Sequence, residues 1–346
     1  MIKKTKIGFE ILSLFLLVIA IVGCGENSRR DNDEDFKKSN EGLTMEFVEN
    51  FPRDSYIVED EKEDIPIIVD IRNKGVYPAE NDESEKDHFT TGRLYLSGFD
   101  DAIIKMKSKE KRFSDGVYLT GASSINSRGG FYSAEFTGDI IAGKLLVDKY
   151  EPTILATLCY PYSTKVSPTV CVDPHPFDQR QEKVCEIGSK TLPEQGAPIA
   201  ITRIDQEAST KKIQFKITIE NVGDGDVIWR DGTKSRWEEE LPSVMEKCNP
   251  LSKEILDRKD FDKVYMESIT IGGKDILGNC MPFVDENSNI IRLFDGRGSV
   301  ICTLDLESPE FEGVESAITT PLNIILRYGY RSTISKPIEI TKLTGR

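Results

Sequence analysis

The sequence predicts an all-β protein built as two tandem antiparallel β-sandwiches. Short runs of β-branched and aromatic residues alternate with Gly, Asn, Asp and Pro, as in proteins of many short strands. Several of these runs alternate apolar and polar residues, and one order of runs occurs twice along the chain. We also expect a short helical insertion in the second sandwich and a signal segment before the first.

Period-two alternation marks three strands of the first sandwich. The runs Ile65 to Ile71, Gly92 to Gly98 and Gly130 to Phe136 each place apolar side chains at every second residue. Successive side chains of a strand point to opposite faces of the sheet. Each run therefore has one face for a core and one for water.

An internal repeat supports the duplication. IPIIVDIRNKGVYPAE and KIQFKITIENVGDGDVI each describe a strand that ends in Asn-x-Gly. TILATLCYPYSTKVSPTVCV matches PLNIILRYGYRSTISKPIEI more closely, and places Tyr160 and Tyr162 opposite Tyr328 and Tyr330. We interpret this second match as two strands joined by a bend that close each domain. The repeat predicts a first domain at 43–170, a linker at 171–195 and a second domain at 196–346.

Two stretches depart from a plain sandwich. Residues 235–262 are charged, have apolar residues at mixed helical spacing and contain Pro242 and Pro250, so we expect two short inserted helices. The acidic run from Glu80 to His88 is typical of a disordered loop.

The first residues have the composition of an export signal. Three lysines precede an uncharged apolar run, Ile11 to Val22, which is shorter than the about 20 residues of a spanning helix. Gly23 followed by Cys24 resembles a bacterial-type lipobox. The resemblance implies a signal peptide at 1–23, cleavage before Cys24, and a lipid on the Cys24 sulfur that anchors the chain to the membrane. The polar residues 24–42 then predict a disordered spacer.

Two other interpretations of this segment stay open. The stretch from Ile7 to Cys24 would remain as a membrane helix if Glu10 lay near an interface. The run around Gly8 also loosely resembles a type IV pilin signal, although Glu10 lies too close to the glycine for the usual pattern.

Six cysteines remain beyond Cys24, an even number that permits disulfides in an exported chain. We predict a pair between Cys171 and Cys185, which flank a polar loop as two arms of a hairpin would, and a second pair between Cys280 and Cys302. Cys159 and Cys248 are left either as buried free thiols or as a third pair. No Cys-x-x-Cys spacing occurs, which disfavours a structural zinc site.

The two strands that end in Asn73-Lys74-Gly75 and in Asn221-Val222-Gly223 resemble immunoglobulin-like modules of the CARDB type. The chain as a whole resembles uncharacterised archaeal lipoproteins that carry two such modules behind a lipobox. The resemblance implies two tandem immunoglobulin-like sandwiches and a location at the cell surface. It implies no activity.

The sequence offers little material for catalysis. Its two histidines, His88 and His175, both lie in polar, loop-like stretches, and no phosphate-binding, GxSxG or HExxH motif occurs. We predict no catalytic, cofactor-binding or metal-binding residues. The net charge of −14 disfavours nucleic acid as a partner.

Trp229 and Trp237 are the only tryptophans and flank a charged segment. Aromatic residues near a loop can anchor a partner, so both are candidate partner-binding residues. Packing of the inserted helices on the sandwich is the competing interpretation.

These observations favour a non-enzymatic, lipid-anchored binding or scaffolding protein at the cell surface, on the outer face of the cytoplasmic membrane. Its expected partners are the membrane, through the lipid at Cys24, and other surface proteins or envelope components. A subunit of a surface filament or envelope assembly is the alternative. A hydrolase that uses carboxylates of this acidic chain is the third hypothesis.

Overall fold

The computed structural model describes residues 39–343 apart from positions 60, 80–81, 83–84, 86–88, 116, 118, 179–182, 230–242, 253–255, 286–287 and 310–315. The chain divides into two compact units, Met1–Asp35 and Phe36–Arg346, and the described residues all belong to the second. The predicted signal peptide, Cys24 and most of the predicted spacer lie outside the described residues. Among the described residues, none lies in a helix long and apolar enough to cross a membrane.

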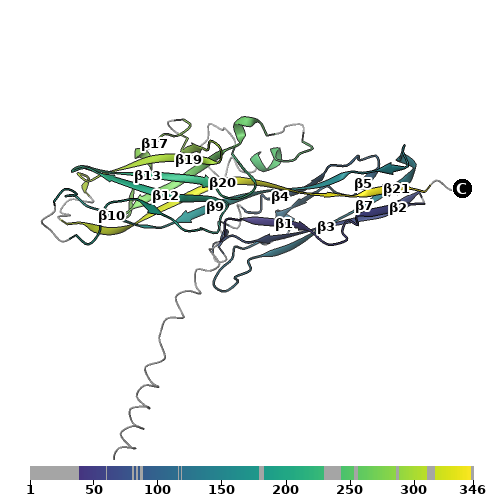
Figure 1. Cartoon of the computed structure of the whole chain (residues 1–346), viewed down its shortest axis with the longest axis horizontal. Coiled ribbons are helices and arrows are strands. Elements are labelled where there is room, and N and C mark those ends of the chain that lie inside the picture. Colours follow the sequence, from purple (N-terminus) through teal and green to yellow (C-terminus); the bar gives the residue numbers. More distant parts are fainter. Residues whose placement is uncertain are drawn as a thin grey trace, which may run out of the picture. The chain divides into compact units, whose positions relative to one another are not determined.

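The fold is all-β and consists of packed, mostly antiparallel sheets, which confirms the predicted sandwich class (Figure 1). The first half of the unit has a four-stranded sheet of β1 (Leu43–Phe47), β3 (Lys62–Asn73), β7 (Phe131–Ile141) and β5 (Ile104–Met106). The second half has a five-stranded sheet of β11 (Lys190–Thr191), β12 (Ile199–Ala208), β13 (Lys212–Asn221), β19 (Arg297–Asp305) and β17 (Cys280–Met281).

A nine-stranded sheet is common to both halves. Its main path is β16 (Lys274–Asp275), β15 (Lys263–Ile271), β20 (Ile318–Pro337), β9 (Thr153–Val166), β4 (Arg93–Ser97) and β6 (Glu110–Arg112). β10 (Thr169–Val172) and β14 (Asp226–Ile228) also pair with β20, and β18 (Ile290–Arg292) pairs with β15. A small sheet of β2 (Ser55–Val58), β21 (Glu339–Lys342) and β8 (Lys149–Tyr150) contains a parallel pair, β2 with β21.

In the described part of the chain, four 3-10 turns lie between strands: η2 (Phe113–Asp115), η3 (Ala142–Lys144), η4 (Arg258–Asp260) and η5 (Leu277–Asn279). In the predicted helical insertion, residues 243–247 are α-helical and η4 follows them. The described part of this insertion therefore has one α-helical turn and one 3-10 turn.

The long strands β9 and β20 pair with each other in antiparallel fashion along the whole length of β9, from Thr153↔Pro337 to Val166↔Ile324. Figure 1 shows them side by side through both halves. The sequence match predicts two equivalent strands, and both are present. Each is followed by a bend at a proline, Pro168 or Pro337, and then by β10 or β21. Their pairing with each other, however, was not predicted: each strand begins in one half and continues into the other.

The register makes the duplication explicit. Tyr160 pairs with Tyr330 and Tyr162 with Tyr328, so a pseudo-two-fold axis passes between Pro161 and Gly329. The outer sheets obey the same relation, because Leu43 of β1 pairs with Asn73 as Ile199 of β12 pairs with Asn221. β1 and β12 are therefore equivalent strands of the two copies.

Alternation of burial along the strands explains why these residues form sheets. In β3, Ile65, Ile67, Val69 and Ile71 are fully buried, whereas the residues between them are partly exposed. β13 repeats the pattern with Ile213, Phe215, Ile217 and Ile219. Burial of each such side chain contributes about 1.5–3 kcal/mol. One continuous hydrophobic cluster includes these residues from both halves.

Three disulfides join the six cysteines beyond Cys24. The predicted pairs Cys171–Cys185 and Cys280–Cys302 are both present. Cys171 lies in β10, which pairs with β20 rather than with the chain around Cys185, so the predicted two-armed hairpin is wrong. Three disulfides indicate an oxidising, extracytoplasmic environment.

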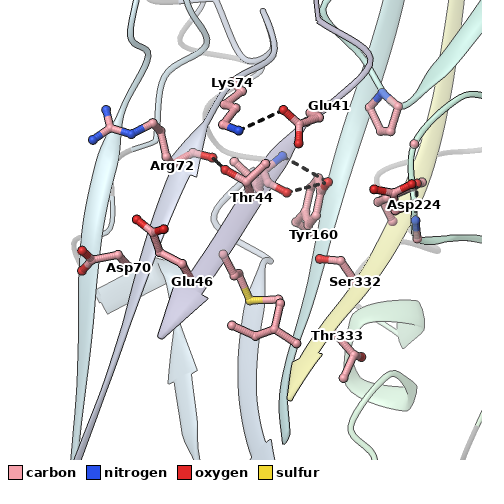
Figure 2. A pocket seen from close by; sticks show the side chains of 18 of the residues that line it. Glu41, Thr44, Glu46, Asp70, Arg72, Lys74, Tyr160, Asp224, Ser332 and Thr333 are labelled. Atoms are coloured by element: carbon pink, nitrogen blue, oxygen red, sulfur yellow. Dashed lines mark hydrogen bonds and ion pairs between the residues drawn. The ribbon is translucent and has the colours of Figure 1, made fainter. Parts of the chain in front are cut away.

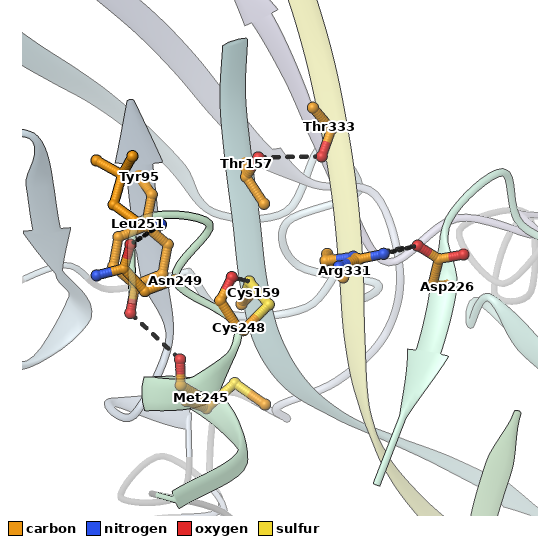
Figure 3. The surroundings of a disulfide bond; sticks show 10 residues. All are labelled: Tyr95, Thr157, Cys159, Asp226, Met245, Cys248, Asn249, Leu251, Arg331 and Thr333. Carbon is orange, nitrogen blue, oxygen red and sulfur yellow. Dashed lines mark hydrogen bonds and ion pairs between the residues drawn. A yellow bond between two sulfur atoms is a disulfide. The ribbon is translucent and has the colours of Figure 1, made fainter. Parts of the chain in front are cut away.

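The third disulfide, Cys159–Cys248, decides between the two interpretations left open for these cysteines. It ties β9 to the insertion that follows β14 (Figure 3). Beside it, the Tyr95 hydroxyl donates to the carbonyl of Met245 at 3.2 Å. The disulfide and this hydrogen bond both fix the insertion to the outer surface of the shared sheet.

Candidate functional site: a groove beside strand β1

A groove of about 470 Å³ opens between the edge of β1 and the C-terminal part of β20 (Figure 2). One wall is the continuous run Gly42, Leu43, Thr44, Met45 and Glu46, and the other is Ser332, Thr333 and Ile334. β1 is the end strand of its sheet, and β14 pairs with β20 only as far as Arg331. Two strand edges thus face the groove.

The backbone of β1 shows which groups point into the groove. Val48 N–H donates to Ile68 O, and Lys74 N–H donates to Gly42 O, so the even-numbered residues bond to β3. In an antiparallel pair these roles alternate along the strand. Leu43, Met45 and Phe47 therefore direct their N–H and C=O groups away from β3. Within the described part of the chain, no backbone hydrogen bond joins Met45 or Phe47 to another strand at this edge.

The inner end of the groove is closed by a buried tyrosine. The Tyr160 hydroxyl accepts from Leu43 N–H at 3.1 Å and donates to Leu43 O at 3.4 Å. Burial, reinforced by the neighbouring tyrosines, raises the pKa of Tyr160 well above its ordinary value. Because the hydroxyl stays neutral, it can serve Leu43 as donor and acceptor together.

The Asn-x-Gly motif lies against the next tyrosine. Asn73 Oδ1 accepts from Gly75 N–H at 3.1 Å and from the Tyr162 hydroxyl at 3.2 Å, while Asn73 Nδ2 donates to Tyr77 O at 2.7 Å. A side chain at position 75 would clash with the Tyr162 hydroxyl. The motif therefore needs asparagine for its amide and glycine for its lack of a side chain.

The second copy repeats these bonds. Asn221 Oδ1 accepts from Gly223 N–H at 3.3 Å and from the Tyr330 hydroxyl at 3.1 Å, and Asn221 Nδ2 donates to Gly225 O at 2.8 Å. Ile199 N–H donates to the Tyr328 hydroxyl at 3.4 Å, as Leu43 does to Tyr160. Burial raises the pKa of Tyr330 to about 12. The motif that carries the resemblance thus anchors the outer sheet of each copy to the shared sheet.

Acidic residues predominate around the groove. Its lining contains four carboxylates and two cations: Glu41, Glu46, Asp70, Asp224, Arg72 and Lys74. Lys74 pairs with Glu41 at 3.1 Å, and Arg72 lies over the ring of Phe131 at 4.9 Å. Among the described residues, Glu46 and Asp224 have no cation within 4.0 Å. Ser332 Oγ, also in the lining, is buried without a hydrogen-bond partner in the structure.

The described residues contain no group of three or more His, Cys, Asp or Glu side chains placed to hold a metal ion. Glu46 and Asp70 are cross-strand neighbours in the β1–β3 pair, and Asp70 accepts from Ser133 Oγ at 2.6 Å. These carboxylates give this side of the groove a negative charge, which favours cationic side chains of a partner.

A second hollow, of about 730 Å³, lies on the outer face of the five-stranded sheet. Its charged lining residues are Lys216, Arg292 and Arg297, and Phe294, Phe283 and Pro282 also line it. Arg297 pairs with Glu220 at 3.1 Å. This hollow is therefore basic, in contrast to the acidic lining beside β1.

The candidate partner-binding residue Trp229 does not face solvent. Its side chain is 2% exposed and stacks on Tyr265 with ring centroids 5.4 Å apart. The prediction that Trp229 contacts a partner is wrong in this structure, because the residue packs the insertion against the sheet. Trp237 lies outside the described residues.

The two histidines are not brought together by any described contact. His175 is exposed in a turn, where its backbone N–H donates to Asp173 Oδ1 at 2.9 Å. His88 lies outside the described residues.

Sequence reasoning missed a buried ion pair. We expected the run from Glu80 to His88 to be disordered, but Glu85 is 4% exposed and binds Arg327 of β20 through both carboxylate oxygens, one contact measuring 2.8 Å. Burial opposes ionisation of Glu85, but hydrogen bonds from Arg327 and Lys165 outweigh it and lower its pKa to about 2. A buried arginine needs a carboxylate partner. The sequence contained no sign of this burial, because Arg327 alternates with the core residues Leu326 and Tyr328 and so lies on the outer face of the strand.

Comparison with known proteins identifies no family for the chain. No protein-family profile matches it, and no curated protein matches it. A solved structure titled "BspA_C_mut" aligns over 88% of this chain and 99% of its own, at 8% identity and a TM-score of 0.18. That similarity is too low to carry any argument about fold or function.

Proposed function

We propose that this chain is a non-enzymatic binding or scaffolding protein of the cell surface, held at the membrane by a lipid on Cys24. The groove beside β1 is its binding surface. A partner that occupies this groove is thereby held at a fixed place on a rigid, disulfide-bonded body.

The observation that carries the proposal is the open edge of β1 within a lined groove. Unpaired N–H and C=O groups at a sheet edge attract another strand, and native proteins usually cover or blunt such edges. Here β1 contributes four consecutive residues, Leu43 to Glu46, to one wall of the groove, and exposed charged side chains surround it. Protein recognition at sheet edges uses this combination of backbone and side-chain contacts.

The lipid anchor is supported by the lipobox-like Gly23-Cys24 sequence, and the surface location by the three disulfides. Metabolic labelling with a lipid precursor tests the anchor directly. We expect label on the wild-type chain and none on Cys24→Ser. Cleavage at Gly8, or an uncleaved leader without label, contradicts the anchor.

Crosslinking in intact cells tests the binding role. A photoreactive residue at Thr333, on the exposed wall of the groove, is expected to capture a neighbouring protein, whereas one at Lys212, exposed on β13, serves as the matched control. Self-crosslinking into ladders instead supports the filament alternative. Absence of any captured protein contradicts both.

A further inference from the structure

The second copy of the fold already contains a strand at the edge that is open in the first. Ile201 of β12 is the equivalent of Met45, because Ile201 pairs with Ile219 as Met45 pairs with Ile71. The Gln195 side chain accepts from Ile201 N–H at 3.0 Å and donates to Ile201 O at 2.7 Å. The groups that Met45 leaves open are therefore bound in the second copy.

The coverage continues along β12. β11 pairs in antiparallel fashion with Ile204 and Arg203, and Leu192 N–H donates to Thr202 O at 3.0 Å. Ile204 is the equivalent of Phe47, since each lies opposite the residue four positions before the motif asparagine. In the segment that covers β12, the side chain of Leu192 is partly buried against the core, and Ile187, just before β11, packs in the same way. An extended segment with apolar side chains thus occupies this edge in one copy.

We propose that the groove beside β1 binds an extended segment of a partner protein, which adds to the sheet as a strand antiparallel to β1. This rests on the proposed function and names its partner class. The segment binds the N–H and C=O groups of Met45 and Phe47, in the way that residues 190–195 bind β12. Backbone hydrogen bonds supply affinity, and the groove walls supply selectivity.

The charges of the groove specify the segment further. Glu46 and Asp224 are exposed and unpaired with cations among the described residues, and the lining has an excess of carboxylates. Lys or Arg side chains at alternate positions of the segment complement these groups. Apolar side chains at the positions between them meet Met45 and Ile334 of the lining.

A second copy of this chain fits the groove poorly. Each molecule has a net charge of −14, so two molecules of this chain repel each other. The chain's own strand of the required kind, residues 190–195, is committed to β12 by the bonds described above. Donation of this strand to a neighbour would leave Ile201 unpaired.

Selection from a displayed library of nine-residue peptides on the detergent-solubilised full chain tests the proposal. We expect enriched peptides that alternate apolar and basic residues, and whose affinity falls as salt is raised. Their binding should slow amide hydrogen exchange at Met45 and Phe47.

Two substitutions at one position separate backbone from side-chain recognition. Met45→Pro removes the N–H that faces the groove without removing a bond to β3, and should weaken binding of the selected peptides at least tenfold. Met45→Ala keeps the N–H and should weaken it less than threefold. Phe47→Pro repeats the test independently, and thermal unfolding of each variant confirms that it folds.

Unchanged binding to Met45→Pro and Phe47→Pro overturns the proposal. Failure to enrich any peptide also overturns it, as does strong protection of the Met45 amide in the chain alone, which would mean that the chain or a second copy covers the edge. Photocrosslinked partners that map to another surface would overturn this inference and the assignment of the groove as the binding surface, but would leave the proposed binding role at the cell surface standing.

Discussion

Cys159 and Arg327 occupy equivalent positions on the two long strands, directly before the first tyrosine of each pair, and each binds a connecting segment of the other copy. Cys159 of β9 forms a disulfide with Cys248, which lies between β14 and β15 of the second copy. Arg327 of β20 binds Glu85, which lies between β3 and β4 of the first copy. One contact is covalent and the other ionic. Both link the halves on the outer side of the shared sheet.

Removal of the covalent contact should destabilise the protein more than removal of a local disulfide. Cys159 and Cys248 are 89 residues apart, whereas Cys171 and Cys185 are 14 apart. In the chain-entropy model these loops correspond to about 4.6 and about 3 kcal/mol. Urea unfolding of the two double Cys→Ser variants checks the order. A greater loss from the Cys171 and Cys185 variant would contradict it.

Removal of the ionic contact should make the free energy of unfolding less dependent on pH in the acidic range. Glu85→Gln removes the carboxylate that binds the buried Arg327 through both of its oxygens, so we expect a loss of about 3 kcal/mol at pH 7. Because the pKa of Glu85 is lowered from 4.5 to about 2, its stabilisation is complete above pH 4.5 and disappears as pH falls toward 2.

Urea unfolding of wild type and Glu85→Gln from pH 7 to pH 2 measures this difference. The gap between the two proteins should close on acidification. A gap that stays constant down to pH 2 would show that Glu85 does not act through its charge.

The two Asn-x-Gly motifs predict matched effects in the two copies. Tyr162→Phe and Tyr330→Phe each remove a hydroxyl that donates to the motif asparagine. We expect each variant to lose about 1–2 kcal/mol in thermal or urea unfolding, and the double variant to lose about the sum. A negligible effect in one copy would mean that the anchor is not shared.

Gln195 should control the edge of the second copy. Gln195→Ala removes the side chain that binds both backbone groups of Ile201, while β11 remains paired with β12. The Ile201 amide should then exchange with solvent at least tenfold faster by NMR, and amides in β13 should not change. An unaltered Ile201 rate would show that Gln195 does not cover the edge.

The sequence predicted the strands of this fold better than it predicted which strands pair with each other. Alternation found β3, β4 and β7, and the repeat found β9 and β20, because these features depend on residues close in sequence. The pairing of Tyr160 with Tyr330 joins positions 170 residues apart, and nothing local distinguishes it from separate closure of each domain.

The candidate site was missed for a related reason. The unpaired N–H and C=O groups of Met45 cannot be predicted from the side-chain pattern, since the sequences of β1 and β12 are both typical of ordinary strands. Trp229 was a candidate partner-binding residue because tryptophan is rare in the chain and lies beside a charged segment. An aromatic side chain in that position can equally pack inside the protein, as Trp229 does against Tyr265. The buried role of Glu85 was hidden because acidic composition describes the run as a whole and not the one residue that meets Arg327.

Residue-resolved amide exchange of the full chain without ligand tests the central claim most directly. Met45 and Phe47 should exchange at least a hundredfold faster than Ile201, whose N–H is bonded to Gln195, although the three residues occupy equivalent places in the two copies. Equal protection at Met45 and Ile201 would mean that the first edge is covered as the second is, and would contradict the account of an open binding edge.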